Sequence, residues 1–389
     1  MKKLLITGVN TRSVVNSALK LNYDVYSTSY FSTHDFIKPL HEKHILNQVK
    51  GKSSKRIEEN YNVDKLLDIS KDYLEEVDYI IPLSGISESD FKDKYKNKII
   101  GNKNTRNLEN KYSFYKKIKN KFITPETFRL KDIGELREII ENDKTKQYLI
   151  KPIEGYGGYH INFLNNDALN ELNDIENNWI IQEYISGKNL SSSVLGLKNS
   201  SKTIMNSRNL NESDFKNENS FKYSGNLLPL DNKTLKLESA QKIIKEMGTL
   251  SEDIIKYFNL IGSNGVDYIL DKNNELYVIE VNPRFQGTYE SCEYILNINM
   301  VEAHIKACNN ELIEIKKDIN NYSIKKIIYS ENKMKIPKLK IKNLYDIPYP
   351  ETIVEKNEPL ATIICENTNF KKLCENLKIT ETELKKLYI

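Results

Sequence analysis

Three oxygen-bearing side chains, Asp267, Glu280 and Asn282, lie in two short apolar segments, GVDYIL and YVIEVNPRF, that predict neighbouring strands. Glu280 and Asn282 are two positions apart, so the period of a strand places both side chains on one face, where Asp267 can join them. Two carboxylates and an amide oxygen are hard ligands that suit Mg²⁺. The alternative is a polar sheet face open to solvent. We favour a metal site, because an acidic residue within the apolar run VIEV requires a partner.

A second segment whose residues could bind a ligand is KPIEGYGG, which runs from Lys151 to Gly158. Glycines let backbone N–H groups approach phosphate oxygens closely, and a lysine at the end of a strand supplies a mobile positive charge. The segment lacks the Gly-Lys-Ser/Thr ending of a Walker A loop. Phosphate binding and a plain tight hairpin therefore both remain open at this point.

Arginine is rare in this chain, with seven residues among 58 basic ones. A chain that uses lysine by default has reason to retain arginine where a planar, bidentate cation is needed. Arg208 and Arg284 are candidates on that ground, although an exposed strand charge is the alternative for Arg208. The apolar strand WIIQEYISG ends in a polar pair and a glycine, and its backbone could pair with the edge of an adenine base.

The elements that must position these residues begin with a parallel α/β pattern over the first hundred residues. Strands are predicted at 3–7, 24–27 and 79–82, each ending in small or polar residues, where open α/β sheets bind ligands. The first strand is followed by GVNTRSV, which has one glycine and so lacks the dinucleotide-binding fingerprint. A boundary is predicted near residue 105.

A mixed α/β layer follows, with strands QYLIKP, HINFL and WIIQEY, and helices at 132–142 and 167–175. A long amphipathic helix is predicted at 237–258, and a hairpin turn at 271–274 joins the two segments that carry the acidic residues. Beyond about residue 310 the pattern is β-rich and closes on a lysine-rich helix.

Composition narrows the class of protein. The net charge is +4 over 389 residues, which is too small to indicate a basic surface that binds nucleic acid. The sequence contains no apolar run near the ~18 residues that a membrane helix needs. Four cysteines without paired spacing suit a reducing compartment, so we expect a cytoplasmic protein.

The order and spacing of these motifs resemble the ATP-grasp superfamily over nearly the whole chain. The resemblance implies an α/β fold, α+β in its central part. It divides into a Rossmann-like domain (1–105), a two-lobed ATP-grasp domain (106–310, with a central lid at about 122–186) and a small β-rich subdomain (311–389). It further implies ATP and one or two Mg²⁺ ions, with Mn²⁺ as a substitute, and Asp267, Glu280 and Asn282 match the metal positions.

Other residues take roles by matching the family's motifs. Arg284 and Lys151 are the implied catalytic residues, and we add Arg208 to them as a cation for the γ-phosphate or a substrate carboxylate. The implied nucleotide-binding residues are Lys111, Lys151, Gly155, Gly157, Gly158, Gln182, Glu183, Tyr184, Ile185 and Asn189, the last standing where the family commonly has an acidic ribose ligand. Ser84, Gly85 and Ser224 are expected to border the substrate.

The chain most resembles the archaeal branch of predicted ATP-dependent carboligases related to biotin carboxylase, through PLSG, IIGNKNTRNLENK, NPRFQGT and the tail DIPYPETIVEKNEPLATI. Glu351 stands in this tail where such proteins often have glycine. The leading expectation is a carboxylate–amine ligase that acts on a small metabolite or coenzyme precursor through an acyl phosphate. A bicarbonate-activating carboxylase and a non-catalytic ATP-binding regulator are the alternatives. The expected partners are ATP, a small carboxylate and an amine, and a homodimer is the candidate assembly.

Overall fold

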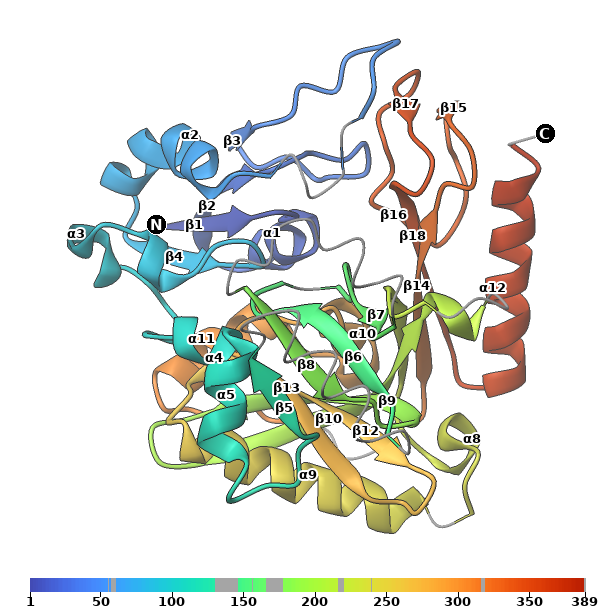
Figure 1. Cartoon of the computed structure of the whole chain (residues 1–389). Coiled ribbons are helices and arrows are strands. Elements are labelled where there is room, and N and C mark those ends of the chain that lie inside the picture. The colour runs from blue at the N-terminus through green and yellow to red at the C-terminus, as the bar shows by residue number, and fades with distance from the viewer. Residues whose placement is uncertain are drawn as a thin grey trace.

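The computed structural model describes residues 1–54, 56, 61–129, 146–155, 157–165, 178–215, 220–238, 240–315 and 319–387. The N-terminal part contains a four-stranded parallel sheet in the order β3-β2-β1-β4 (Figure 1). This arrangement confirms the predicted α/β start. Its elements are β1 (Lys2–Gly8), α1 (Arg12–Ala18), β2 (Tyr23–Ser29), β3 (His41–His44), α2 (Val63–Glu76), β4 (Tyr79–Pro82), η2 (Glu88–Asp90) and α3 (Asp93–Lys96).

A second small sheet forms the central layer in the order β5-β8-β6-β7, with every neighbouring pair antiparallel. Its strands are β5 (Thr127–Arg129), β6 (Tyr148–Pro152), β7 (Asn162–Phe163) and β8 (Trp179–Glu183). The strand expected over HINFL is shorter than predicted, because His160 adopts a left-handed φ of 57° that ends extended pairing. The helices predicted at 132–142 and 167–175 lie outside the described residues.

The largest sheet has eight strands in the order β13-β12-β9-β10-β11-β14-β18-β16. Five of them come from the central region: β9 (Gly187–Gly196), β10 (Ser201–Asn211), β11 (Tyr223–Leu228), β12 (Gly262–Asp271) and β13 (Leu276–Asn282). The predicted hairpin joins β12 to β13, and Asn274 takes the left-handed conformation in its turn, at φ 65°. The amphipathic helix α9 (Ala240–Tyr257) packs along β9 and β10 and buries its apolar face there (Figure 1).

In the part of the chain that the structure describes, three of the C-terminal strands extend this sheet and two others pair with each other. Strands β14 (Tyr322–Tyr329), β18 (Pro359–Asn367) and β16 (Leu344–Tyr345) follow β11, the pair β15 (Met334–Lys335) and β17 (Ile353–Val354) forms a short ribbon, and α12 (Phe370–Lys385) packs on β18. Glu351 adopts a φ of 67°, the conformation that favours glycine, and its carboxylate pairs with Lys50 at 2.7 Å and Lys335 at 3.2 Å. The turn thus forms without glycine. The predicted domain limits at 105 and 310 stay predictions.

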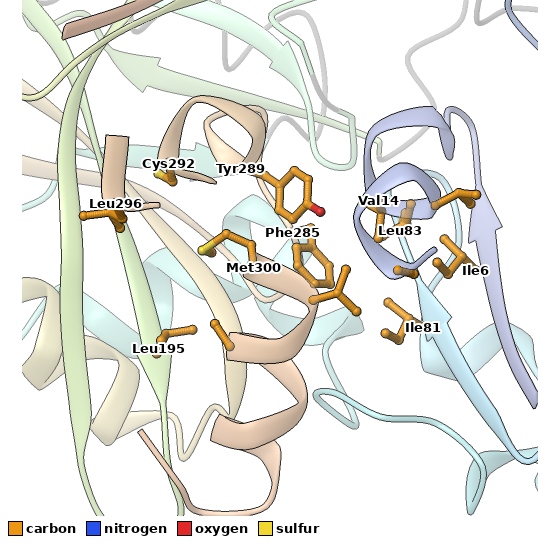
Figure 2. Packing of buried hydrophobic residues seen from close by; sticks show 14 of the residues in the cluster. Ile6, Val14, Ile81, Leu83, Leu195, Phe285, Tyr289, Cys292, Leu296 and Met300 are labelled. Carbon is orange, nitrogen blue, oxygen red and sulfur yellow. The ribbon is translucent and has the colours of Figure 1, made fainter. Parts of the chain in front are cut away.

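The first domain and the large sheet share one hydrophobic core (Figure 2). Ile6 and Ile81 of the parallel sheet face Phe285, Tyr289 and Met300, which come from the loop after β13 and from two helices. Those helices are α10 (Tyr289–Leu296) and α11 (Met300–Cys308). Because this contact is apolar and buried, it fixes the strand ends of the first domain beside the residues that follow β13.

No helix in the part of the chain that the structure describes combines the length and apolarity needed to cross a membrane.

Candidate active site

Asp267 and Glu280 lie directly opposite each other on β12 and β13, as the sequence predicts. Asn282 donates from its Nδ2 to Asp267 Oδ2 at 2.9 Å and lies 3.5 Å from Glu280 Oε1. A register shift between Asp267 and Tyr268 places two residues of β13 opposite one of β12, which lets Val278 and Val281 both enter the core. The bulge therefore keeps the three oxygen-bearing side chains on one face.

Burial and mutual repulsion set the charges of this acidic pair. Burial and the neighbouring Glu280 carboxylate raise the pKa of Asp267 to about 7. Burial would also raise the pKa of Glu280, but the positive charges of Lys111 and Lys151 outweigh it and hold that pKa below its usual value. Glu280 stays ionised, and Asp267 ionises readily beside a cation. With the amide oxygen of Asn282, these two carboxylates form a donor set that fits Mg²⁺.

Lys151 is a buried cation at the end of β6, with 5% of its side chain exposed. Its Nζ donates to Gln182 Oε1 at 2.5 Å, and Gln182 in turn donates from Nε2 to Thr127 Oγ1 at 2.8 Å. Burial, with a smaller contribution from Lys111, lowers the pKa of Lys151 to about 7. Its hydrogen-bond partner on the neighbouring strand is neutral, so the charge remains available for an anion such as a phosphate.

Lys111 begins α5 (Lys111–Ile118), and Asn110 caps that helix by accepting the N–H of Ser113. Lys111 Nζ donates to the backbone carbonyl of Gly155 at 2.8 Å, so both predicted lysines meet at the glycine-rich loop. Burial lowers the pKa of Lys111. The charged groups that act on Lys111 are Glu280, Arg284, Glu154 and Glu109, so a cluster of charge surrounds this lysine.

The glycine-rich loop lies against the segment before β11. The backbone N–H of Tyr223 donates to the carbonyl of Gly157 at 2.9 Å. Gly158 has a φ of 74°, and a Cβ atom there would lie 2.0 Å from the carbonyl oxygen of Phe221. Only glycine fits this close approach. Gly155 also has a positive φ, of 152°, at the lysine end of the loop.

The end of β8, the predicted adenine hinge, has part of its backbone already engaged. The N–H groups of Glu183 and Tyr184 donate to the carbonyls of Glu126 and Gln147, both at 2.8 Å. Both N–H groups are already hydrogen-bonded within the protein. Ile185 is therefore the next residue whose backbone could pair with the edge of an adenine base. Asn189, the expected ribose residue, is half-buried on β9, two positions from Ser191 and so on the same strand face.

The structure separates the two candidate arginines. Arg284 follows β13, and its Nε lies 3.6 Å from Glu109 Oε1, close to Lys111. Arg208 on β10 lies opposite Leu190 on β9 in the sheet, and Leu190 packs in the core beneath α9. The guanidinium of Arg208 binds Asp214. The next residue, Asn209, points the other way and donates from Nδ2 toward Asp267 Oδ1 at 3.4 Å. The predicted role of Arg208 at the phosphates therefore has no geometric support, because strand alternation places it on the opposite face.

Three comparisons with known proteins bear on this geometry. Residues 108–288 match the family model described as ATP-grasp domain. An uncharacterised protein of Methanocaldococcus jannaschii, MJ0776, is 34% identical over 383 residues, covering 96% of this chain and 91% of its own. This chain is a member of the ATP-grasp family.

Other relatives of this ATP-grasp protein have stated activities. A tyramine–L-glutamate ligase of Methanocaldococcus fervens is 28% identical over 279 residues, which cover 69% of this chain and 79% of that protein. The biotin carboxylase domain of the Hydrogenobacter thermophilus 2-oxoglutarate carboxylase, solved with MgADP and bicarbonate, superposes with a TM-score of 0.76 at 16% identity. It covers 97% of this chain and 89% of that one. The chain is an ADP-forming ligase that makes C–N bonds, with ATP and Mg²⁺ as its cofactors.

The three residues expected to border the substrate of this ATP-grasp ligase do not line the small cavity beside Arg284. Gly85 is fixed inside the first domain, where its carbonyl accepts the Tyr61 hydroxyl at 2.6 Å, and the carbonyl of Ser84 accepts the N–H of Val9 at 2.9 Å. Ser224 is buried on β11. The wall of the cavity includes Ile86, the residue after Gly85, together with Ser87, Glu109, Arg284 and Phe285.

Several residues of the site carry no signal in the sequence that predicts them. Glu109 precedes Lys111 by two positions, and Asn209 follows Arg208, but neither type is unusual in this asparagine- and glutamate-rich chain. Gln286 lies over Gly265, where a Cβ atom would come within 1.4 Å of its Nε2, and it donates to Ser191 Oγ at 3.2 Å. The tight approach at Gly265 indicates that the loop after β13 is held firmly against β12.

Proposed function

We propose that this ATP-grasp protein is a carboxylate–amine ligase that activates a small carboxylate as an acyl phosphate and transfers the acyl group to an amine. The observation that carries the proposal is the charge arrangement around Glu280. The charges of Lys111 and Lys151 act on this carboxylate, and Asp267 and Asn282 lie next to it. Cations and metal ligands that converge in this way are what phosphoryl transfer requires.

Each residue takes a role that follows from its position. Mg-ATP, when bound, supplies the γ-phosphoryl group and the divalent charge that accompanies its transfer. Lys151 and Lys111 neutralise phosphate charge, the glycine-rich loop covers the phosphates, and Asp267, Glu280 and Asn282 hold the metal. Gln182 keeps Lys151 in place, and Ile185 meets the base. Arg284 is suited to the transferred phosphoryl group, because it follows Asn282 by two residues and lines the cavity.

The strand ends of the first domain and the loop after β13 enclose the place where the carboxylate would be activated. The shared apolar core holds these two parts together, so a substrate group that enters the cavity would be positioned rather than free to diffuse. Such positioning contributes much of the rate in reactions that need no covalent enzyme intermediate. The substrate is a small metabolite or coenzyme precursor on this proposal.

Bicarbonate activation is the second candidate. It is favoured by the likeness of the whole chain, C-terminal strands included, to a biotin carboxylase domain that was solved with bicarbonate. The relatives with ligase names favour the amine route instead, and they make tyramine and L-glutamate sensible first members of a substrate screen.

Phosphate release from Mg-ATP by the purified protein tests the proposal. The screen uses pools of amino acids, other small carboxylates and amines, each with and without bicarbonate. We expect one carboxylate–amine pair to stimulate release and to yield an amide of the summed mass less water. Stimulation by bicarbonate alone would replace the ligase with a carboxylase. A homodimer and a cytoplasmic location remain predictions, which light scattering and cell fractionation address.

A further inference from the structure

A small cavity separates the first domain from the loop after β13, and among the residues assigned above to ATP and metal only Arg284 lines it. Its walls include Pro82 at the end of β4, Ser87 before η2, Asn102, Glu109, Arg284 and His304. The enclosed volume is about 20 Å³. A space of this size holds a group as large as one water molecule, and an ammonium group is of that size.

Glu109 is the acidic residue of this cavity that stands next to Arg284. It is the last residue of α4 (Arg106–Glu109), which packs on β13, and its side chain is 34% exposed. Among the described residues, Arg284 is the only partner with which Glu109 forms an ion pair, and their 3.6 Å separation is long for one. The carboxylate therefore retains acceptor capacity toward the cavity.

The surroundings of Glu109 favour uptake of a proton. Burial raises its pKa, and the charges of Asp90 and Glu154 act in the same direction, while Arg284 opposes them. The other acidic wall residue, Glu88, is already engaged, since it accepts the backbone N–H of Asn104 at 3.1 Å and lies 3.8 Å from Lys96. Glu109 is thus the acidic wall residue that can still accept a hydrogen bond on the side of Arg284.

We propose that Glu109 is a catalytic residue that binds the ammonium group of the incoming amine in this cavity and accepts its proton. The proposal rests on the proposed function, because it concerns the second half of that reaction. A protonated amine has no lone pair, so it cannot attack until one N–H bond breaks and its proton moves to the carboxylate. Arg284, which also lines the cavity, would hold the phosphoryl end of the acyl phosphate.

The step balances as follows. The ammonium group loses one proton to Glu109 and gains its lone pair, which forms the C–N bond at the acyl carbon. The C–O bond to the phosphoryl group breaks, and its electron pair leaves with phosphate. The second proton of the nitrogen passes to the departing phosphate, and Glu109 later returns its own proton to water.

Comparing a charged with an uncharged nucleophile tests this role. The carboxylate found in the screen is incubated with Mg-ATP and either the amine found there, with ethylamine as a minimal charged probe, or hydroxylamine, which is uncharged at neutral pH. For Glu109→Gln, we expect amide formation to fall by about 100-fold or more, the usual contribution of a positioned base. Hydroxamate formation should fall far less, because hydroxylamine needs no deprotonation before attack. Glu302→Gln, an exposed glutamate of α11 that pairs with Lys306, is the matched control.

The outcomes separate the possible failures. Equal losses with both nucleophiles would show that Glu109 acts only by orienting Arg284, and unchanged rates would remove it from the reaction; either result overturns the proposal. Partial retention of amide formation by Glu109→Asp would support it. If the wild-type protein forms neither amide nor hydroxamate with any carboxylate, the ligase function itself is wrong, which is distinct from a failure confined to Glu109→Gln.

Discussion

Asn282 bridges the acidic pair of the site, because its Nδ2 lies 2.9 Å from Asp267 Oδ2 and 3.5 Å from Glu280 Oε1. The amide nitrogen is thus the atom of Asn282 that contacts both carboxylates. This contact holds two carboxylates in place that would otherwise repel each other. A preorganised set of ligands of this kind makes metal binding sensitive to each member.

Glu280→Gln removes one negative charge from that set at almost constant volume. We expect Mg-dependent ATP turnover to fall by at least about 100-fold, in line with the loss of groups that tune a metal site. Thermal unfolding in the absence of ATP should remain cooperative. Glu275→Gln, an exposed residue of the same hairpin, is the control. Turnover in Glu280→Gln that matches this control would remove Glu280 from the metal site.

Lys151→Met replaces a buried cation with an apolar side chain of similar length. The free protein should stay folded, because the change removes a desolvated charge. A hydrogen bond to a charged group contributes about 1.5 to 3 kcal/mol, so we expect ATP affinity to fall roughly 10- to 100-fold. The shift in melting temperature that Mg-ATP produces should shrink accordingly. Lys116→Met on the exposed side of α5 should retain the full shift, and an equal shift in both variants would contradict the assignment.

Arg208 and Asn209 are neighbours with opposite predicted effects. Arg208→Gln should leave ATP turnover within about two-fold, since its side chain faces Asp214 on the side of the sheet away from Asp267. Asn209→Ala removes a donor to Asp267 and should weaken Mg²⁺ binding by about 10- to 100-fold. Titration of turnover with MgCl₂ measures both. The reverse ranking would return Arg208 to the phosphates.

His304 links stability to pH at the contact between the first domain and α11. Its Nδ1 accepts the N–H of Ser263 at 2.8 Å, and its Nε2 lies 3.1 Å from the carbonyl of Ile100, so Nε2 carries the proton and the ring is neutral. Burial lowers its pKa to about 4. Between the unfolded value of ~6.5 and about 4, the unfolded chain binds a proton that the folded chain does not, so stability falls as pH falls through this window.

The size of that loss is roughly 3 kcal/mol at pH 4. Denaturant unfolding from pH 7 to pH 4 measures it. His304→Gln should show a shallower decline than the wild type, whereas replacement of the exposed His34 by Gln should follow the wild-type curve. Parallel curves for all three proteins would show that His304 does not titrate in this way.

The sequence predicted that Asp267, Glu280 and Asn282 lie together and that Lys151 ends a strand, because these placements depend on local periodicity and on motif order. Glu280 and Asn282 share a face at any register, and Lys151 ends a strand that is apolar in its own right. The fold class followed from the same alternation of strands and helices, and the family comparison confirmed it.

What remained hidden depends on contacts between distant segments. The face on which Arg208 lies is set by its pairing with Leu190, and the meeting of Glu109 with Arg284 joins residues 175 positions apart. The C-terminal strands contain the apolar alternation of a sheet, but nothing local indicates that β14 pairs with β11 rather than with its own neighbours only. Such pairings are decided by the burial that the whole fold achieves.

Transfer of ¹⁸O is the most direct test of an acyl phosphate in this ATP-grasp ligase. The carboxylate identified by the phosphate-release screen is labelled with ¹⁸O in both oxygens and converted in the presence of Mg-ATP and the amine. Attack of a carboxylate oxygen on the γ-phosphoryl group, followed by loss of phosphate, leaves one labelled oxygen in each inorganic phosphate. Mass spectrometry of the phosphate should therefore show one ¹⁸O per turnover. Unlabelled phosphate formed together with the amide would contradict the account.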